Sequence, residues 1–257
     1  DAKSWTKLKG AVPRSHVRAA HGGKVTAVAA FGGGFATAGF DDTVRFCDGA
    51  AYDAEVKVDG QPKGLAALGG DNVAVATTKG LAIVSKGATF AGVVKFEAVA
   101  WDATALAAAP DGSKFAVGAK DGAIRVFDAS LAEVAAPPPQ RGEITSLAWS
   151  PDGSKLAAGD ADREIKVYDA SAGFAVVVQN LWRFHTARVT ALAWSPDSMF
   201  LASSSNDESI FYWSLANPQK SAHKYDFAHK DGTTALAFLG GTVVSAGNDA
   251  CVCLWTV

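Results

Sequence analysis

The sequence predicts an all-β fold, and features that recur along the chain support this. A turn phrase, Pro-Asp followed by Gly or Ser, occurs at Pro110, Pro151 and Pro196, so that its prolines are 41 and 45 residues apart. Proline presets the backbone for the second position of a tight turn. The apolar runs on either side of the second turn, Leu147–Trp149 and Leu156–Ala158, have the length of β-strands.

A second phrase follows each turn and in four copies ends on an aromatic residue six positions after its leading residue. Within it, apolar and polar side chains alternate, as in Ile165–Tyr168, with the period of two that is typical of a strand. The leading residues are Asp41, Lys79, Asp121, Asp162, Asp207 and Asp249. Units of about 41 residues with room for four short strands indicate a β-propeller. We therefore predict six complete four-stranded blades between about residue 21 and residue 257.

The first twenty residues are interpreted by the same spacing. Trp5 precedes His21 by 16 residues, as Trp213 precedes His229. Trp5 would then end the third strand of a truncated seventh repeat, and residues 12–19 would form an outer strand that completes the last blade and protects its edge. On this interpretation residues 1–257 form one propeller, residues 1–20 are the tail of a truncated repeat, and more sequence lies upstream.

Composition excludes several classes of function. The 24 Lys and Arg residues are balanced by 26 Asp and Glu residues, for a net charge of −2, so there is no basic excess for nucleic acid or an anionic membrane. No apolar run reaches the roughly 18–20 residues of a membrane span. Three cysteines, Cys47, Cys251 and Cys253, are too few for a disulfide framework, and we expect a cytoplasmic protein.

The repeated phrases resemble the WD40 repeat. Trp213-Ser214 and Trp255-Thr256 stand at the position that gives this repeat its name, and Phe127-Asp128 and Tyr168-Asp169 are aromatic variants. The resemblance implies a hydrogen-bonded set within a blade: a His before the first strand, a Ser or Thr in the second, an Asp in the following turn and a Trp in the third.

Three units contain this set, and buried imidazole and carboxylate groups do require such partners. The sets are His185, Ser203, Asp207 and Trp213; His229, Ser245, Asp249 and Trp255; and His21, Thr37 and Asp41, with Cys47 in place of Trp. We expect a structural role for these residues and for the turn residues Asp121 and Asp162. The units led by Lys79, Asp121 and Asp162 lack the full set and should depend more on apolar packing.

Longer segments resemble the actin-interacting protein 1 family, in order along the whole chain. The most specific is Trp182–Ser198, which contains Phe184-His-Thr-Ala-Arg188, and Gln61-Pro62-Lys63 fits the same family. The resemblance implies the second propeller of a two-propeller protein that binds cofilin-decorated actin filaments and promotes their disassembly. The alternative is a generic WD40 scaffold in another complex. A second WD40 array upstream would favour the first, and an F-box-like or helical segment the second.

The spacing of the histidines, cysteines and aspartates does not support catalysis or metal binding. None of the five histidines stands at zinc-ligand spacing with a cysteine, and the repeated aspartates belong to different blades. We therefore predict no enzyme activity, no metal and no cofactor. A propeller hydrolase would need convergent carboxylates or histidines that the sequence does not offer.

Candidate partner-binding residues lie in the loops before the first strands of blades, since propellers usually bind through loops on one face. They are Arg141, Arg183, Phe184, Arg188 and Lys230. The family's partner, actin, is acidic, so basic loops are plausible contacts. The alternative is that these charges are only solvated, because isolated exposed charges contribute little specific energy.

Overall fold

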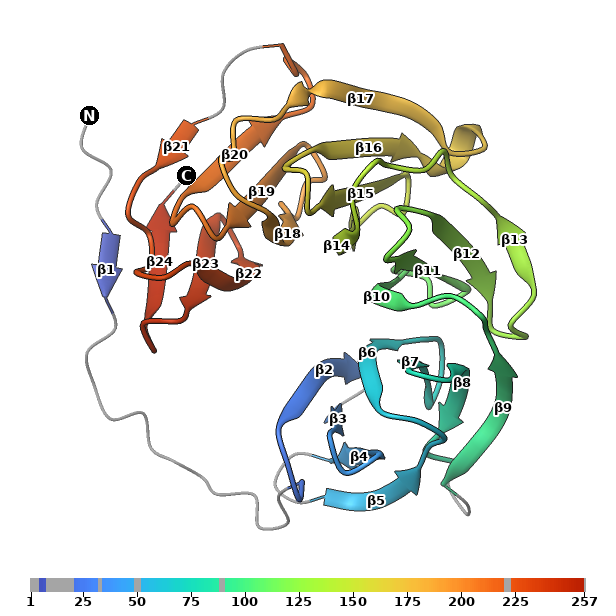
Figure 1. Ribbon diagram of the computed structural model, residues 1–257. Helices are drawn as coiled ribbons and strands as arrows, with labels where there is room; N and C mark the ends of the chain where they lie inside the picture. Colours follow the sequence, from blue (N-terminus) through green and yellow to red (C-terminus); the bar gives the residue numbers. More distant parts are fainter. Residues whose placement is uncertain are drawn as a thin grey trace. The chain divides into compact units, whose positions relative to one another are not determined.

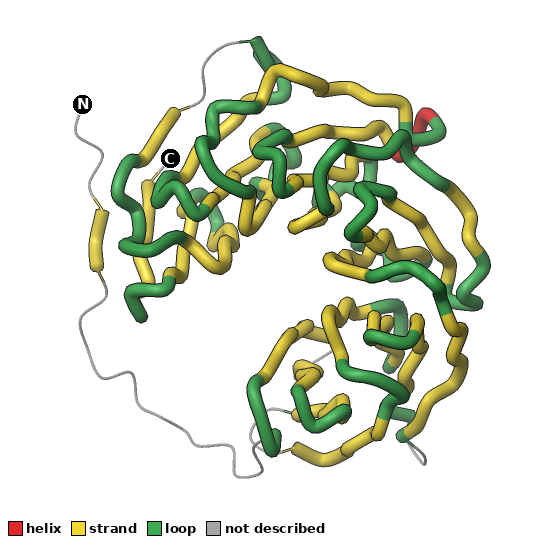
Figure 2. The backbone as a smooth tube through the Cα atoms, viewed as in Figure 1, coloured by secondary structure: helices red, strands yellow, loops and turns green. Residues whose placement is uncertain are grey.

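The structure is a computed structural model that describes residues 5–7, 21–31, 34–48, 52–87, 91–219 and 223–256. These residues form antiparallel four-stranded sheets and one short 3-10 turn, η1 (Ala170–Ala172), as Figures 1 and 2 show. Within each of the six sheets the strands are consecutive in sequence, apart from β1 in the last. The predicted all-β fold with six four-stranded blades is confirmed. None of the described helical segments is long and apolar enough to cross a membrane.

Residues 11–136 form one compact unit, with three sheets that we call blades 1, 2 and 3. Blade 1 contains β2 (Val25–Phe31), β3 (Gly34–Gly39), β4 (Thr43–Cys47) and β5 (Tyr52–Lys57). Blade 2 contains β6 (Pro62–Ala67), β7 (Asn72–Thr77), β8 (Gly80–Ser85) and β9 (Gly92–Ala98). Blade 3 contains β10 (Ala103–Ala108), β11 (Lys114–Ala119), β12 (Ile124–Asp128) and β13 (Glu133–Ala135). The first strands of these blades, β2, β6 and β10, are neighbours in that order.

Residues 1–10 and 137–257 form the other unit, with blades 4, 5 and 6. Blade 4 contains β14 (Ile144–Trp149), β15 (Lys155–Asp160), β16 (Ile165–Asp169) and β17 (Ala175–Trp182). Blade 5 contains β18 (Val189–Trp194), β19 (Phe200–Ser205), β20 (Ile210–Ser214) and β21 (His223–Tyr225). Blade 6 contains β22 (Thr233–Leu239), β23 (Thr242–Gly247), β24 (Val252–Thr256) and β1 (Trp5–Lys7). The first strands β14, β18 and β22 are again neighbours.

The outer strand of blade 6 differs from the sequence interpretation. We predicted residues 12–19 for that position and assigned Trp5 to a third strand, but β1 pairs antiparallel with β24, with Trp5 opposite Trp255. The physical reason is that β24 would otherwise present a row of unpaired backbone groups at the edge of its sheet, and a short segment can satisfy them. Residues 12–19 lie outside the described part of the chain.

The Pro-Asp phrases form the turns predicted from the sequence. In each, the aspartate carboxylate accepts a hydrogen bond of 3.0 Å from the backbone N–H two residues later, in copies led by Asp111, Asp152 and Asp197. The residue after the aspartate has a φ of +67° at Gly112, +71° at Gly153 and +60° at Ser198. Glycine adopts this left-handed backbone conformation most easily, because it has no Cβ.

Successive side chains of a strand point to opposite faces of its sheet, and the apolar side chains on a face pack against the neighbouring blade. The cluster between blades 4 and 5 includes Ile165 and Val167 from one side and Leu201 and Trp213 from the other. The indole of Trp194 on β18 also donates a 3.0 Å hydrogen bond to the carbonyl of Ala148 on β14. Apolar burial and a few such bonds therefore join adjacent sheets.

Each blade has two chemically distinct ends, which blade 5 illustrates. The loop before β18 and the turn between β19 and β20 meet at what we call the entry end, where Asn206 N donates to Arg188 O at 3.3 Å. The turn between β18 and β19 and the segment after β20 meet at the opposite end, where Leu215 N donates to Met199 O at 3.1 Å. A propeller can therefore present separate surfaces at the two ends of its strands.

The backbone approach in blade 2 gives a stability prediction. Gly80 pairs with Ala98, and a Cβ added to Gly80 would lie 2.1 Å from the carbonyl oxygen of Glu97. Gly80→Ala must therefore displace backbone, and we expect it to lower the free energy of unfolding by about 1–3 kcal/mol, seen as a lower Tm. Gly241→Ala is the matched control, because a Cβ there meets nothing within 4 Å. Equal Tm values for the two variants would contradict this account.

Candidate functional site

The predicted set of blade 5 is brought together at its entry end. His185 Nδ1 lies 3.0 Å from Asp207 Oδ2, and His185 Nε2 lies 2.8 Å from Ser203 Oγ. The indole N–H of Trp213 donates to the same serine oxygen at 2.8 Å. All groups are satisfied when the imidazole carries its proton on Nδ1, donates it to Asp207 and accepts from the Ser203 hydroxyl.

The Asp207 carboxylate is strongly stabilised in its charged form. Burial alone would raise the pKa of Asp207, but hydrogen bonds from His185 and from Ser209 Oγ, the latter 2.6 Å long, outweigh burial and hold it well below its ordinary value of 3.8. The backbone N–H of Thr186 also donates to it at 2.7 Å. One carboxylate thus joins the loop before β18 to the turn after β19.

Blade 6 repeats this arrangement. His229 Nδ1 is 2.9 Å from Asp249 Oδ1, and His229 Nε2 is 2.7 Å from Ser245 Oγ. The Trp255 indole donates to Ser245 Oγ at 2.8 Å. Burial opposes ionisation of Asp249, but the bond to His229 nevertheless lowers the pKa of Asp249 below its ordinary value.

Blade 1 keeps the set although Cys47 replaces the tryptophan. His21 lies 2.8 Å from both Asp41 Oδ1 and Thr37 Oγ1. Tyr52, which is opposite Cys47 in the register of β4 and β5, places its hydroxyl 3.3 Å from Thr37 Oγ1. A phenol from the outer strand therefore takes the place of the missing indole, a substitution that sequence spacing within the repeat does not reveal.

Blades 2 and 3 join the same two segments with different chemistry. In blade 2, Asp59 stands 20 residues before Lys79, as His21 stands before Asp41, and the Lys79 ammonium lies 2.6 Å from Asp59 Oδ1. The acid and the base have exchanged positions. In blade 3, Trp101 takes the histidine position and stacks on Phe127 with ring centroids 6.4 Å apart. The Arg125 guanidinium also lies 4.5 Å from the centroid of the Trp101 ring and pairs with Asp121 at 3.6 Å. Blade 3 therefore combines aromatic packing with a paired cation.

Blade 4 uses neutral hydrogen bonds and a buried acidic pair that the sequence analysis missed. Gln140 takes the histidine position and donates to the carbonyl of Ala158 at 2.9 Å. Asp160 is fully buried and accepts from the backbone N–H of Glu164 at 2.8 Å, and burial, with a contribution from the Glu164 carboxylate, raises the pKa of Asp160. Asp162, in contrast, is exposed. The apolar packing expected for this blade is thus only part of what joins it.

The predicted partner-binding residues all lie in entry-end loops of blades 4, 5 and 6. Their side chains are exposed: Arg141, Arg183, Phe184, Arg188 and Lys230. Phe184 is 53% exposed, yet its ring stacks on that of Trp213 at 5.7 Å and 11°. The exposed aromatic ring therefore stands on the buried indole of the hydrogen-bonded set.

Neighbouring entry-end loops are also tied to each other. Arg188 lies 3.7 Å from Glu143, which precedes β14, and the backbone N–H of Asp231 donates to Glu208 at 3.0 Å. A further exposed aromatic, Phe227, lies in the loop before β22 with 86% of its surface accessible. Sequence reasoning missed Phe227, although it stands two residues before the predicted His229. The loops of this unit thus form a linked surface with aromatic and basic side chains.

The described residues contain no group of three or more His, Cys, Asp and Glu side chains that could hold a metal ion. Three of the four described histidines are engaged in the sets above. The chemistry of this end is therefore that of a rigid polar framework carrying exposed Phe and Arg side chains.

Comparisons with known proteins agree with this architecture. The family described as WD domain, G-beta repeat matches residues 98–128, 137–169 and 177–214, which contain the first three strands of blades 3, 4 and 5. Among solved structures, the computationally designed Ika8 protein has a TM-score of 0.75 at 22% identity, over 92% of this chain and 72% of that one. The Cps50 (Swd1) β-propeller domain of Myceliophteria thermophila has a TM-score of 0.76 at 15% identity, over 93% and 85%. The chain is a WD40 repeat protein.

Two curated relatives extend along nearly all of the chain. The 66 kDa stress protein of Physarum polycephalum is 34% identical over 244 residues, which are 92% of this chain and 40% of that protein. Actin-interacting protein 1 of Drosophila melanogaster is 34% identical over 245 residues, 92% of this chain and 39% of that protein. The chain thus spans about two fifths of the length of these relatives.

The hydrogen-bonded set of blade 5 gives a pH prediction. Because the folded-state pKa of Asp207 is lowered, its stabilisation is present above the ordinary value of 3.8 and is lost as the pH falls below it. We expect Asp207→Asn to lower the free energy of unfolding by about 1–3 kcal/mol at pH 7, with a smaller difference from wild type below about pH 4. Urea unfolding at both pH values measures this.

The matched control is Asp162→Asn, which removes the same charge from the corresponding turn of the blade that has Gln140 in place of histidine. We expect a change within about 0.5 kcal/mol for this exposed residue. A deficit of Asp207→Asn that is the same at both pH values would show that the carboxylate charge is not what stabilises the turn.

Proposed function

We propose that this chain binds actin filaments and assists their disassembly by cofilin, as one part of a longer WD40 protein. The observation that carries the proposal is the 34% identity to Actin-interacting protein 1 over 92% of this chain. The cofilin part rests on the family resemblance of segments such as Phe184–Arg188. The more general function, a WD40 scaffold for protein–protein interaction, is the alternative.

The entry-end surface of blades 4, 5 and 6 supports a role in binding a large partner. Exposed aromatic and Arg side chains are the types that most often dominate interface energies. Phe184 is held by its stacking on Trp213, so that little conformational entropy is lost when a partner covers it. Arg188 and Lys230 supply positive charge for an acidic surface such as that of actin.

The proposed mechanism uses binding energy alone. A protein that binds one state of the filament more tightly than another shifts the equilibrium toward that state by its differential affinity. Asp207 and Asp249 accept hydrogen bonds within their own turns, in keeping with a structural role. Promotion of disassembly would therefore require preferential binding to a cofilin-decorated or severed filament.

Co-sedimentation tests this proposal. Actin filaments are centrifuged with this chain, with and without cofilin, and the chain and actin are measured in pellet and supernatant. We expect cofilin to increase the amount of chain in the pellet, or the chain to increase cofilin-dependent actin in the supernatant. Phe184→Ala and Arg188→Ala should each weaken binding by roughly tenfold, as expected for interface residues worth about 1.4 kcal/mol.

Val177→Ala is the matched control, because Val177 is 46% exposed but lies on the outer strand β17. If a chain that circular dichroism shows to be folded changes neither pellet nor supernatant, the proposal is wrong for this segment and the scaffold alternative stands. Equal losses for Val177→Ala and Phe184→Ala would exclude the entry-end surface as the contact.

A further inference from the structure

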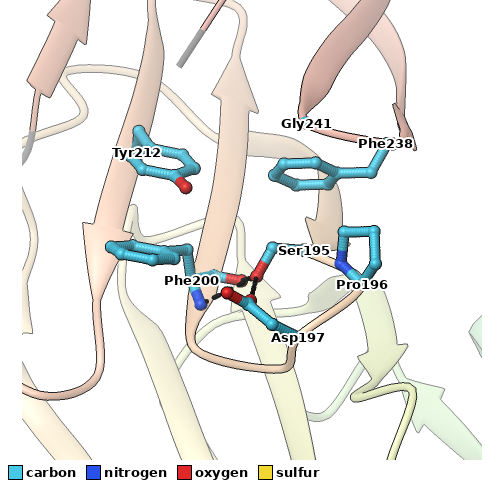
Figure 3. A pocket seen from close by; sticks show the side chains of 8 residues that line it. Ser195, Pro196, Asp197, Phe200, Tyr212, Phe238 and Gly241 are labelled. Carbon is cyan, nitrogen blue, oxygen red and sulfur yellow. Dashed lines mark hydrogen bonds between the residues drawn. The ribbon is translucent and has the colours of Figure 1, made fainter.

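A pocket with aromatic walls lies at the opposite end of blades 5 and 6, away from the entry-end loops. It has a volume of about 340 Å³ and lies between the turn that joins β18 to β19 and the turn that joins β22 to β23. Its lining includes Ser195, Asp197, Phe200, Tyr212, Phe238 and Gly241 (Figure 3). All of these residues belong to the unit that contains residues 137–257.

Three aromatic rings form its walls. Phe200 and Tyr212 are stacked, with centroids 4.8 Å apart and planes 13° apart. Phe238 comes from β22 of the next blade, with its centroid 6.3 Å from that of Tyr212. Figure 3 shows Tyr212 and Phe238 on opposite sides of the pocket. Gly240 and Gly241 also line the pocket, and the space where a Cβ would stand at either residue is open to beyond 4 Å.

A fixed carboxylate adds negative charge. Asp197 accepts hydrogen bonds from Ser195 Oγ at 2.5 Å and from Met199 N at 3.0 Å, and these bonds hold the pKa of Asp197 below its ordinary value. Burial, together with the Asp197 charge, raises the pKa of Tyr212 to about 12, so that the phenol stays neutral. None of the lining residues carries a positive charge.

The repeat itself does not dictate this lining. Blades 3 and 4 have Lys114 and Lys155 where blade 5 has Phe200, and both have Val where blade 5 has Tyr212. The Lys155 ammonium forms an ion pair of 3.0 Å with Asp169 on the neighbouring strand. Where blade 4 has a lysine paired to an aspartate of its own sheet, blade 5 therefore has aromatic rings beside an acidic turn.

We propose that this pocket binds the methylated ammonium group of a lysine side chain on a partner protein. A cation over aromatic faces within about 6 Å gains roughly 0.5–2 kcal/mol, and quaternary ammonium groups are recognised in this way. The neutral rings supply faces for the methyl groups, and Asp197 supplies the countercharge. The pocket is large enough for the head group, since ligand pockets begin at about 300 Å³. This proposal is independent of actin binding.

The test uses blocked single amino acids as probes, with binding measured by the chemical-shift changes of the folded chain. The probes are Nα-acetyl-trimethyllysine methylamide, its neutral isostere with a tert-butyl group in place of the trimethylammonium, and the unmodified and acetylated lysine forms. We expect the trimethylated probe to bind with a Kd of about 1 mM, and the neutral isostere and acetyl-lysine to bind roughly tenfold more weakly. Unmodified lysine, which is more strongly hydrated, should also bind more weakly.

Substitutions of lining residues test whether the trimethylated probe binds in this pocket. Phe200→Lys introduces the residue of blades 3 and 4 and should abolish binding, while Asp197→Asn should weaken it by roughly threefold or more. Asp111→Asn is the matched control, because Asp111 accepts a 3.0 Å hydrogen bond from Ser113 N in the corresponding turn of blade 3, as Asp197 accepts one from Met199 N. It should leave probe binding unchanged. Should Phe200→Lys not fold, Tyr212→Val provides the second test of the aromatic wall.

Several results would overturn the proposal. They are no binding of the trimethylated probe at about 10 mM, equal binding of the neutral isostere, equal binding of unmodified lysine, and undiminished binding to folded Phe200→Lys. None of these depends on actin or cofilin, so failure here leaves the proposed function untouched.

Discussion

Each blade must join the loop that enters its first strand to the turn between its second and third strands. In blades 1, 5 and 6 a buried imidazole makes this connection, and a buried imidazole is tolerable only when both of its nitrogens have partners. The aspartate on one side and the hydroxyl on the other meet that requirement within about 3 Å. In blade 5 the aspartate makes the link between loop and turn, since it accepts from both His185 and the backbone N–H of Thr186.

The other blades show which part of this arrangement is essential. Asp59 and Lys79 reverse the charges, Trp101 stacks on Phe127, and Gln140 bonds to a backbone carbonyl. The constraint is therefore the connection between two segments, not the identity of the groups. The exposed Asp59–Lys79 pair contributes little by itself, because the side chains are 59% and 62% accessible and solvent screens their attraction. The buried Thr77 hydroxyl also links the two segments of blade 2, since it donates to the Asp59 carbonyl at 2.8 Å. Buried sets with several hydrogen bonds fix the loops more firmly.

The sequence predicted the features that local patterns control. Turn phrases, strand alternation and the spacing of Asp to Trp gave the six blades, and the resemblance to the WD40 repeat placed His185, Ser203 and Asp207 in one set. The replacement of the missing indole of blade 1 by Tyr52 was not predictable in this way. Tyr52 lies on an outer strand, whose register depends on loop length. Phe227 and the Asp160–Glu164 pair were missed because solvent exposure and burial depend on how neighbouring loops and blades pack. The outer strand of blade 6 was expected within residues 1–20, at residues 12–19, whereas β1 is the segment that pairs with β24. A short edge strand carries almost no sequence signal.

Blade 5 carries two candidate binding surfaces on the same pair of strands. Side chains alternate along β19 and β20, so Ser203 and Trp213 face blade 4 while Phe200 and Tyr212 face the opposite way, toward blade 6. The hydrogen-bonded set fixes the strands, and with them the walls of the pocket at their other end. The structure shows one arrangement of this sheet, and a demonstrated two-state element would be the physical basis for coupling between its two ends. A partner at the entry end and a cation at the opposite end should therefore bind independently, with the rigid blade as a common support.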